Sequence, residues 1–157
     1  ERTVWRSADQ VLPVTRVLAE DLRRAGVAPD RIQIIPNGIS RHFMPTAPDG
    51  SAVRARYGLK ERTVLGFTGF VREWHGLDRV IDLIADSDPK AGLHMLLVGD
   101  GPARPALEAQ AQAPGVADQV TFAGIVGRDE VASYIAAFDV ALQPQVVSYA
   151  SPLKVFE

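Results

Sequence analysis

Hydrophobic positions after residue 50 fall into short blocks that switch between two periods. Apolar runs predict buried strands at residues 63–68, 93–98, 120–123 and 140–143. Apolar residues at helical spacing predict helices at residues 51–57, 77–85, 103–111 and 129–138. Strands that alternate with helices favour right-handed crossovers and a parallel sheet covered on both faces. The predicted fold class is therefore α/β, a doubly wound, Rossmann-like parallel sheet.

The first forty residues show a different pattern. Thr15 is placed to cap a helix at residues 16–25, and Gly26 is placed to end it. Short apolar runs on either side predict strands at residues 10–15 and 31–36. Pro13 has no N–H to donate, which favours an edge strand or one broken near its end.

Proline and glycine without periodicity mark a connection between two units. Pro45, Pro48 and Gly50 lie in this stretch, which predicts an interdomain linker. The predicted organisation is the end of one domain at residues 1–40, a linker at 41–50 and a second domain at 51–157.

Composition and charge narrow the function classes. The net charge of −2 comes with no basic stripe, so nucleic acid is not an expected partner. The chain has no cysteine, which excludes disulfides, thiol catalysis and Cys-ligated zinc. No apolar run reaches the roughly 18 residues of a membrane span. We expect a cytoplasmic protein, and peripheral association of the full-length protein with the inner face of the membrane stays open.

The last ten residues, S-Y-A-S-P-L-K-V-F-E, follow a predicted strand and show the features of a helix start. Ser151 is a candidate N-cap and Pro152 occupies the first helical position. The backbone N–H groups of Ser151, Leu153 and Lys154 would lack intrahelical partners, and Lys154 adds a positive charge, so this stretch predicts an anion site for phosphate. An ordinary βα turn with a solvated lysine explains the same residues.

Glycine-rich loops follow the other predicted strands: G-F-V-R-E-W-H-G, G-D-G-P-A-R and G-I-V-G-R. Ligands of parallel sheets bind at the carboxyl ends of the strands, where these loops and Arg72 would gather. Turn formation alone also explains the glycines, and a histidine such as His75 is more often structural or solvated than catalytic. G-D-G-P-A-R is not a dinucleotide fingerprint, because its sixth residue is Arg104 and it does not follow the first strand. No nucleophile elbow, P-loop or metal motif is present.

Six segments, read in order, give the chain its resemblance to a known family. They are A-D-Q-V-L-P-V-T at 8–15, I-I-P-N-G-I at 34–39, L-V-G-D-G-P at 97–102, V-T-F-A-G at 120–124, F-D-V-A-L-Q-P at 138–144 and S-P-L-K-V-F-E at 151–157. Together they resemble the C-terminal, donor-binding half of a family 4 (group 1) glycosyltransferase with the two-domain GT-B fold. The resemblance implies that residues 1–40 end the acceptor domain and that 51–157 are an incomplete donor domain.

The resemblance also implies roles for particular residues. Glu157 falls on the carboxylate that bonds the ribose, and residues 151–154 fall on the segment that holds the diphosphate. Gly69 falls on the glycine whose loop approaches the phosphates, and Ile125 lies where the base contacts the main chain. The site residues implied are Gly69, Arg72, His75, Ile125, Ser151, Leu153, Lys154 and Glu157.

Three residues depart from the family pattern. Tyr149 replaces a glutamate that contacts the donor sugar, and Phe70 and His75 replace the Arg and Lys of G-R-x-x-x-x-K. Arg72 is the nearest replacement cation, so Arg72 and Lys154, with His75 third, are the expected phosphate contacts.

The resulting hypothesis is a retaining glycosyltransferase that uses a UDP- or GDP-sugar as substrate, with no cofactor, no metal and no protein nucleophile in this half. The acceptor is open between a glycan, a lipid-linked molecule and a small molecule. Because the sequence stops about one turn into its last predicted helix, we expect a fragment that is inactive alone. The alternatives are a GT-B sugar-nucleotide epimerase and a non-catalytic nucleotide-binding module.

Overall fold

A computed structural model describes residues 2–38 and 48–143. The chain divides into two compact units, and these two ranges belong to the first and the second unit respectively. The predicted phosphate-binding residues Ser151, Leu153 and Lys154 lie outside the described residues, as do Glu157, predicted to bind the ribose, and Tyr149.

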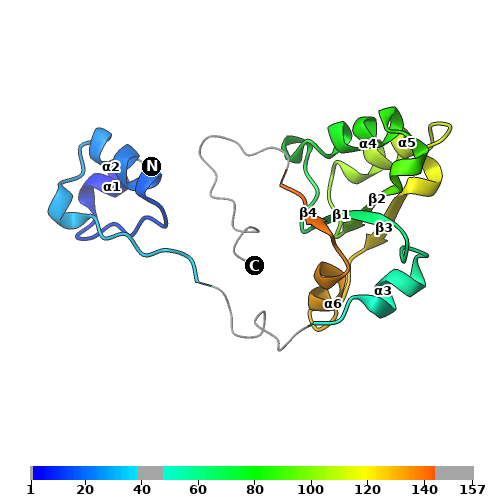
Figure 1. Ribbon diagram of the computed structural model, residues 1–157. Coiled ribbons are helices and arrows are strands. Elements are labelled where there is room, and N and C mark those ends of the chain that lie inside the picture. The colour runs from blue at the N-terminus through cyan, green and yellow to red at the C-terminus, as the bar shows by residue number, and fades with distance from the viewer. Residues whose placement is uncertain (1, 39–47, 144–157) are drawn as a thin grey trace. The chain divides into compact units, whose positions relative to one another are not determined.

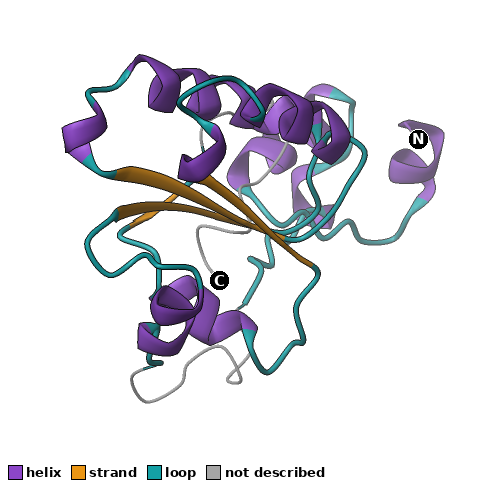
Figure 2. Ribbon diagram, turned by 90° about the vertical axis from the view of Figure 1, so that its right-hand side faces the viewer, coloured by secondary structure: helices purple, strands orange, loops and turns teal. Residues whose placement is uncertain are grey.

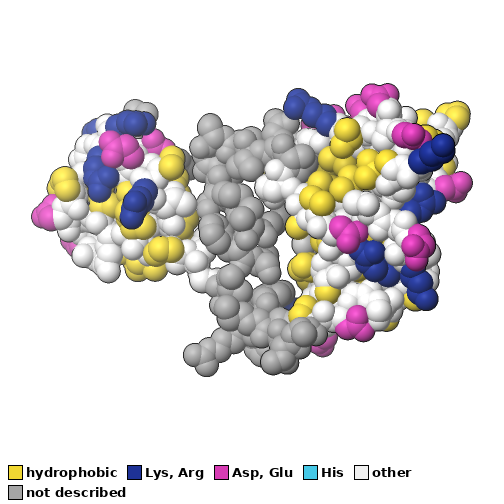
Figure 3. All heavy atoms as spheres, in the orientation of Figure 1, with side chains coloured by type: hydrophobic (Ala, Val, Ile, Leu, Met, Phe, Trp, Pro, Cys, Tyr) yellow, Lys and Arg dark blue, Asp and Glu magenta, His cyan; other side chains and the backbone are white. Residues whose placement is uncertain are grey.

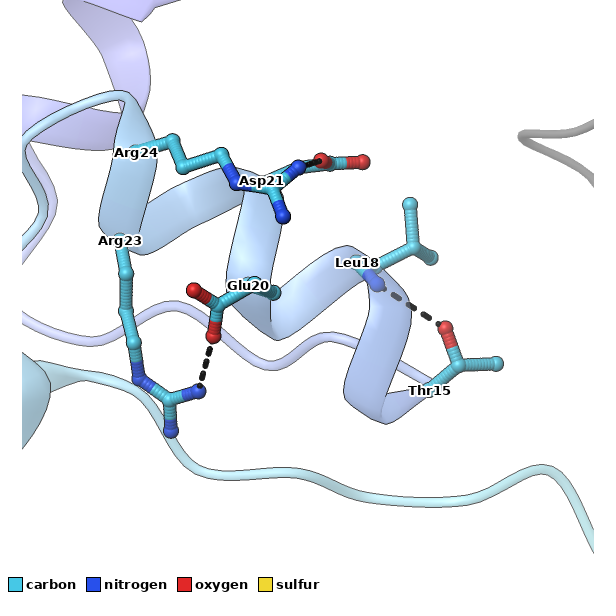
Figure 4. A network of polar contacts seen from close by, with 6 residues as sticks. All are labelled: Thr15, Leu18, Glu20, Asp21, Arg23 and Arg24. Atoms are coloured by element: carbon cyan, nitrogen blue, oxygen red, sulfur yellow. Dashed lines mark hydrogen bonds and ion pairs between the residues drawn. The ribbon is translucent and has the colours of Figure 1, made fainter.

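The described part of the first unit contains helices α1 (Arg2–Ser7) and α2 (Arg16–Arg24) and the 3₁₀ turn η1 (Pro29–Arg31). Thr15 caps α2 as predicted, because its hydroxyl oxygen accepts a hydrogen bond of 3.1 Å from the Leu18 N–H (Figure 4). On the exposed side of the same helix, Arg23 pairs with Glu20 at 3.1 Å and Arg24 pairs with Asp21 at 3.4 Å. Gly26 follows the helix with a φ of 86°, a conformation that favours glycine.

The two strands predicted in this unit are wrong as extended elements. Val11 and Ile32 form only an isolated parallel bridge, flanked by hydrogen bonds from Val11 N–H to Arg31 O and from Gln33 N–H to Val11 O. Pro13 accepts a bond from Ile35 N–H but has no N–H to return, so the ladder stops. Arg31, predicted to begin the second strand, instead ends the 3₁₀ turn.

The second unit is the predicted doubly wound parallel sheet. Its elements are α3 (Ser51–Arg56), β1 (Thr63–Thr68), η3 (Glu73–His75), α4 (Leu77–Asp86), η4 (Pro89–Ala91), β2 (Leu93–Val98), α5 (Arg104–Ala111), η5 (Ala117–Gln119), β3 (Val120–Gly124), α6 (Val131–Ala136) and β4 (Val140–Ala141). The strands are all parallel and lie in the order β3-β2-β1-β4. Helices α4 and α5 cover one face of this sheet, and α3 and α6 cover the other (Figures 1 and 2).

Alternate residues of the central strands supply the two hydrophobic cores. Leu65 and Phe67 of β1 point into the core under α4 and α5, together with Met95 and Leu97 of β2. Val64 points into the opposite core with Leu96 and Val98, against Leu59 and Tyr134. Because both faces are buried, strands β1 and β2 are nearly continuous apolar runs, which is why their boundaries agree with the prediction.

Glycines at two places bring elements of the second unit into direct contact. A Cβ on Gly66 of β1 would lie 2.0 Å from the Phe138 ring, so the ring packs on the bare strand. A Cβ on Gly50 would lie 2.4 Å from the Ala137 nitrogen, at the end of α6. Both contacts join residues far apart in sequence.

Charged side chains of both signs are mixed on the face drawn in Figure 3. This mixing agrees with the net charge of −2. In the part of the chain that the structure describes, no helix has the length and hydrophobicity needed to cross a membrane.

Candidate functional site

The candidate site lies at the carboxyl edge of the sheet, where the parallel strands end together. A glycine with positive φ ends or follows each of three strands: Gly69 after β1 at 125°, Gly99 after β2 at 123° and Gly124 at the end of β3 at 74°. The backbone therefore turns sharply at three neighbouring points of one edge, in conformations that side chains disfavour.

Backbone hydrogen bonds tie the three loops to one another. Gly69 N–H donates to Val98 O at 2.9 Å, and Gly99 N–H donates to Gly124 O at 2.7 Å. Val71 N–H donates to Asp100 O at 2.8 Å. The loops after β1, β2 and β3 thus form one hydrogen-bonded rim rather than three independent turns.

Gly99 and Gly101 have a packing role that differs from the one expected from sequence. A Cβ on Gly99 would lie 2.0 Å from Gly69 O, and one on Gly101 would lie 2.2 Å from Val71 O. Backbone of the β1 loop therefore fills the space beside both glycines, so what they permit is the close approach of one loop to another. The sequence shows that glycines are present in this loop, but it does not show which backbone lies beside them.

Arg72 and His75 belong to the loop after β1. The exposed Arg72 guanidinium lies 4.7 Å from the Phe70 ring centroid and 4.8 Å from that of Trp74. Both distances are in the range of cation–π attraction, so the two aromatic side chains hold the cation in place. Arg72 forms no ion pair with any residue of the described ranges.

His75 is oriented by a backbone group and by a buried ring. Its Nδ1 accepts a hydrogen bond of 3.1 Å from the Arg72 N–H, and its ring centroid lies 4.9 Å from that of Phe67. Because Nδ1 accepts, the neutral imidazole carries its proton on Nε2. Gly69, Arg72 and His75 thus lie on the same loop, between β1 and α4.

Ile125 follows β3 on the neighbouring loop. This residue is 82% exposed, and it follows Gly124, which has a positive φ. Ile125 therefore lies at the same sheet edge as Gly69.

Arg104, at the start of α5, is a residue of this edge that sequence analysis did not single out. Its Nε donates to Glu108 Oε1 at 2.7 Å, and its Nη1 lies 3.6 Å from Asp100 Oδ2. These acidic neighbours raise its pKa, with the hydrogen bond to Glu108 as the main cause. The spacing of Asp100, Arg104 and Glu108 by four residues is the only sequence signal for this network.

A cleft of about 350 Å³ lies between α4 and α5, on a helical face of the sheet. Its lining residues are Arg72, Glu73, Leu77, Asp78, Ala103, Ala106, Leu107 and Gln110. Arg72 alone among the predicted site residues of the described part contributes to it. The cleft therefore borders the carboxyl edge without coinciding with it, and two of its residues, Glu73 and Asp78, carry negative charge.

His94 is a buried histidine with a structural role. It is 5% exposed on β2, and its Nε2 lies 2.8 Å from Thr121 Oγ1 on β3. Burial, with a smaller contribution from Arg62, lowers the pKa of His94 to about 4. The side chain is therefore neutral at physiological pH. Within the described ranges, no group of three or more His, Cys, Asp or Glu side chains is arranged to hold a metal ion.

Sequence comparison identifies the family to which this domain belongs. Residues 62–157 match the family described as "Glycosyl transferases group 1", and residues 1–43 match "Glycosyltransferase Family 4". The chain belongs to the group 1 (family 4) glycosyltransferases.

Individual relatives give the same answer. The chain is 30% identical over 154 residues to a 2-deoxystreptamine glucosyltransferase of Streptomyces kanamyceticus, with 93% of this chain and 39% of the relative covered. It is 30% identical over 115 residues to a GDP-mannose-dependent phosphatidylinositol monomannoside mannosyltransferase of Mycobacterium tuberculosis, with 72% and 30% covered. The chain thus spans well under half the length of these relatives.

Solved structures confirm the fold. Anabaena HepE in complex with UDP-glucose superposes with a TM-score of 0.78 at 22% identity, covering 99% of this chain and 46% of that protein. WaaG, a glycosyltransferase involved in lipopolysaccharide biosynthesis, superposes with a TM-score of 0.69 at 28% identity, covering 87% and 38%. The α/β fold with a parallel sheet of the GT-B type, which the sequence predicted, is therefore confirmed.

Proposed function

We propose that this chain supplies the binding site for the nucleotide diphosphate of a sugar donor, within a glycosyltransferase that acts with retention of anomeric configuration. The observation that carries the proposal is the hydrogen-bonded rim of loops at the carboxyl edge of the sheet. In open parallel sheets this edge is where nucleotides bind. The rim brings Gly69, Arg72 and His75 to the same edge as Ile125.

Each described residue has a defined part in the proposed site. Gly69 leaves room for a phosphate oxygen beside the backbone, and Arg72 supplies a full positive charge to the diphosphate. His75 takes the place of the family's lysine as a phosphate contact, on a ring whose Nδ1 accepts a hydrogen bond from the Arg72 N–H. The main chain at Ile125 contacts the base.

The residues outside the described ranges complete the proposal. Backbone N–H groups of Ser151, Leu153 and Lys154 bind the diphosphate at a helix start, and Lys154 adds charge. Glu157 bonds the ribose hydroxyls. These four assignments come from the family resemblance and from the capping pattern of the sequence.

The contribution of this half to catalysis is electrostatic. As the bond between the sugar and the diphosphate breaks, negative charge develops on the departing phosphate oxygens. Arg72 and Lys154, together with the N–H donors, stabilise that charge more strongly than they stabilise the ground state, which lowers the barrier. No nucleophile from this half takes part.

The relatives support a UDP- or GDP-sugar as donor. HepE was solved with UDP-glucose, and the mycobacterial relative is described as GDP-mannose-dependent. The relatives act on acceptors as different as 2-deoxystreptamine and a phosphatidylinositol mannoside. The acceptor proposed for the whole protein is accordingly a small molecule, a glycan or a lipid-linked molecule. The proposed location is the cytoplasm or the inner face of the membrane.

Nucleotide binding to the intact protein tests the proposal. A thermal-shift panel of UDP, GDP, ADP and their sugars should give a shift with one base, because a ligand that binds only the folded state stabilises it. Arg72→Ala and Lys154→Ala should each weaken binding of that diphosphate by about 1–3 kcal/mol, or roughly 5- to 150-fold. Wild-type affinity in both variants would contradict the phosphate assignment.

Product analysis separates the proposed transferase from the other two functions. A transferase consumes its nucleotide sugar only with an acceptor, whereas an epimerase changes the sugar without one. Binding without turnover over a broad acceptor range identifies a non-catalytic module.

A further inference from the structure

Arg104 lies where α5 begins, against the end of β3. Its guanidinium carbon is 5.9 Å from the Phe122 ring centroid, and its side chain is 25% exposed. Glu108 binds Nε at 2.7 Å, and Asp100 lies 3.6 Å from Nη1. One aromatic ring and two carboxylates thus limit the orientation of the planar guanidinium group.

The guanidinium also lies against Gly124, the last residue of β3. A Cβ built on Gly124 would be 3.5 Å from Arg104 Nη1, which is ordinary van der Waals contact. Arg104 therefore packs beside the main chain just where it turns, at a φ of 74°, toward Ile125.

The same network reaches the loop after β1. Asp100, which pairs with Arg104, accepts through its backbone oxygen the hydrogen bond from Val71 N–H at 2.8 Å. The neighbouring Gly99 N–H donates to Gly124 O at 2.7 Å. The Asp100–Arg104 pair thus connects the β1 loop, which carries Arg72, with the β3 loop, which carries Ile125.

We propose that Arg104 is a positioning residue for nucleotide recognition, which holds the Gly124–Ile125 main chain in the conformation that selects the base. The inference rests on the proposed function, because it takes the main chain at Ile125 as the contact to the base. Ile125 is 82% exposed, so its own side chain does little to fix this segment. A main-chain contact discriminates between bases only when the supporting residues hold it to within about half an ångström.

A purely structural role for Arg104 predicts a different result. An i,i+4 ion pair such as Arg104–Glu108 contributes little to the stability of a helix. Its loss would lower stability slightly and would change the affinity for all nucleotides by one factor. If Arg104 has a positioning role, its loss changes the ratio of the affinities for different nucleotides.

The test compares three nucleotides on the intact protein. Isothermal titration gives the Kd of UDP, GDP and ADP for the wild type, Arg104→Gln, Arg104→Lys and the control Arg79→Gln, an exposed arginine on α4. Arg104→Gln should weaken binding of the preferred diphosphate about tenfold, equivalent to about 1.4 kcal/mol, and binding of the other two by less than about threefold. Arg104→Lys keeps the charge and should recover part of the selectivity, and Arg79→Gln should match the wild type.

The outcomes separate this inference from the proposed function. Equal losses for all three nucleotides, or no loss, would overturn the positioning role while leaving nucleotide binding intact. If the wild type binds all three nucleotides equally, the positioning role is also overturned. If the wild type binds none of them, both the positioning role and the proposed function are overturned. If Arg104→Gln does not fold, Arg104→Lys provides the test. The inference is contradicted if the ratios of its Kd values for the three nucleotides equal those of the wild type.

Discussion

Arg54 of α3 and Asp139, the residue before β4, form an ion pair of 2.6 Å that joins two elements more than eighty residues apart in sequence. The Asp139 carboxylate also accepts the Val64 N–H at 2.7 Å, and Asp139 N–H donates to Val64 O at 2.9 Å. Arg54 in turn donates to the backbone oxygens of Ala137, Leu59 and Arg62. This pair therefore connects α3, the end of α6 and the start of the edge strand β4.

Arg54→Met should destabilise the second unit by about 2–3 kcal/mol, because several partly buried acceptors lose their donor at once. Lys60→Met, at an exposed position of the same unit, should change stability by less than about 0.5 kcal/mol. Urea unfolding followed by circular dichroism measures both. Equal stability of the two variants would show that the Arg54 network contributes little.

Acid should weaken this connection. The Val64 N–H first, and then Arg54, hold the pKa of Asp139 below its ordinary value of 3.8. A carboxylate whose pKa is lowered by folding stabilises the protein above its unfolded pKa, and the stabilisation is lost as pH falls through the folded pKa. Urea midpoints measured from pH 5 down to pH 2.5 should fall more steeply for the wild type than for Asp139→Asn. Parallel curves would contradict the assignment.

His94 should produce a separate pH dependence at higher pH. Its folded pKa of about 4 lies below the ordinary 6.5, so the unfolded chain binds a proton more readily between these values. Stability should therefore decrease as pH falls from about 6.5 to 4, by up to about 3 kcal/mol, and then level off for this group. The double variant His94→Leu/Thr121→Val removes the titrating group and its partner together, which avoids an orphaned hydroxyl. Its stability should fall much less than that of the wild type over this interval, and a slope equal to that of the wild type would refute the role of His94.

Gly99→Ala should be among the most damaging single substitutions at the sheet edge. The new Cβ would lie 2.0 Å from Gly69 O, and the alanine would have to adopt a φ of 123°. We therefore expect the free energy of unfolding to fall by more than about 3 kcal/mol. Gly58→Ala is the matched control, because Gly58 has a φ of 67° and nothing within 4 Å of its Cβ position. That variant should cost only about 1 kcal/mol of backbone strain. Similar losses in the two variants would show that strain, rather than the contact between loops, dominates.

The local pattern of apolar and polar residues was sufficient to predict an element where that element buries its own side chains in the core. The six residues of β1 and of β2 form the strands that their apolar runs predict, because a central parallel strand is buried on both faces. Helix α2 begins and ends as its Thr15 cap and Gly26 predict, because both features act within one turn. Helix α6 is shorter at both ends than the predicted 129–138, at Val131–Ala136, because residues 128–130 form a turn before it and residue 137 a turn after it.

Local pattern failed where an element depends on a partner. The runs at residues 10–15 and 31–36 have strand composition, yet they meet in a single bridge because Pro13 cannot donate and Pro29 starts a 3₁₀ turn. Strand propensity measures how well side chains fit a sheet and does not supply the neighbouring strand.

By itself, the sequence determined the α/β class, the order of strands and helices after residue 50, and the glycine-rich loops at one sheet edge that carry Gly69, Arg72, His75 and Ile125. Only the tertiary structure decided what those loops contact: Gly99 and Gly101 pack on backbone of the β1 loop, His75 accepts from Arg72 N–H, and Arg104 lies beside Gly124. The physical reason is the distance along the chain over which each interaction acts. Burial and capping act within a few residues and leave a pattern along the chain, whereas contacts between loops depend on distances that exist only once the sheet has formed.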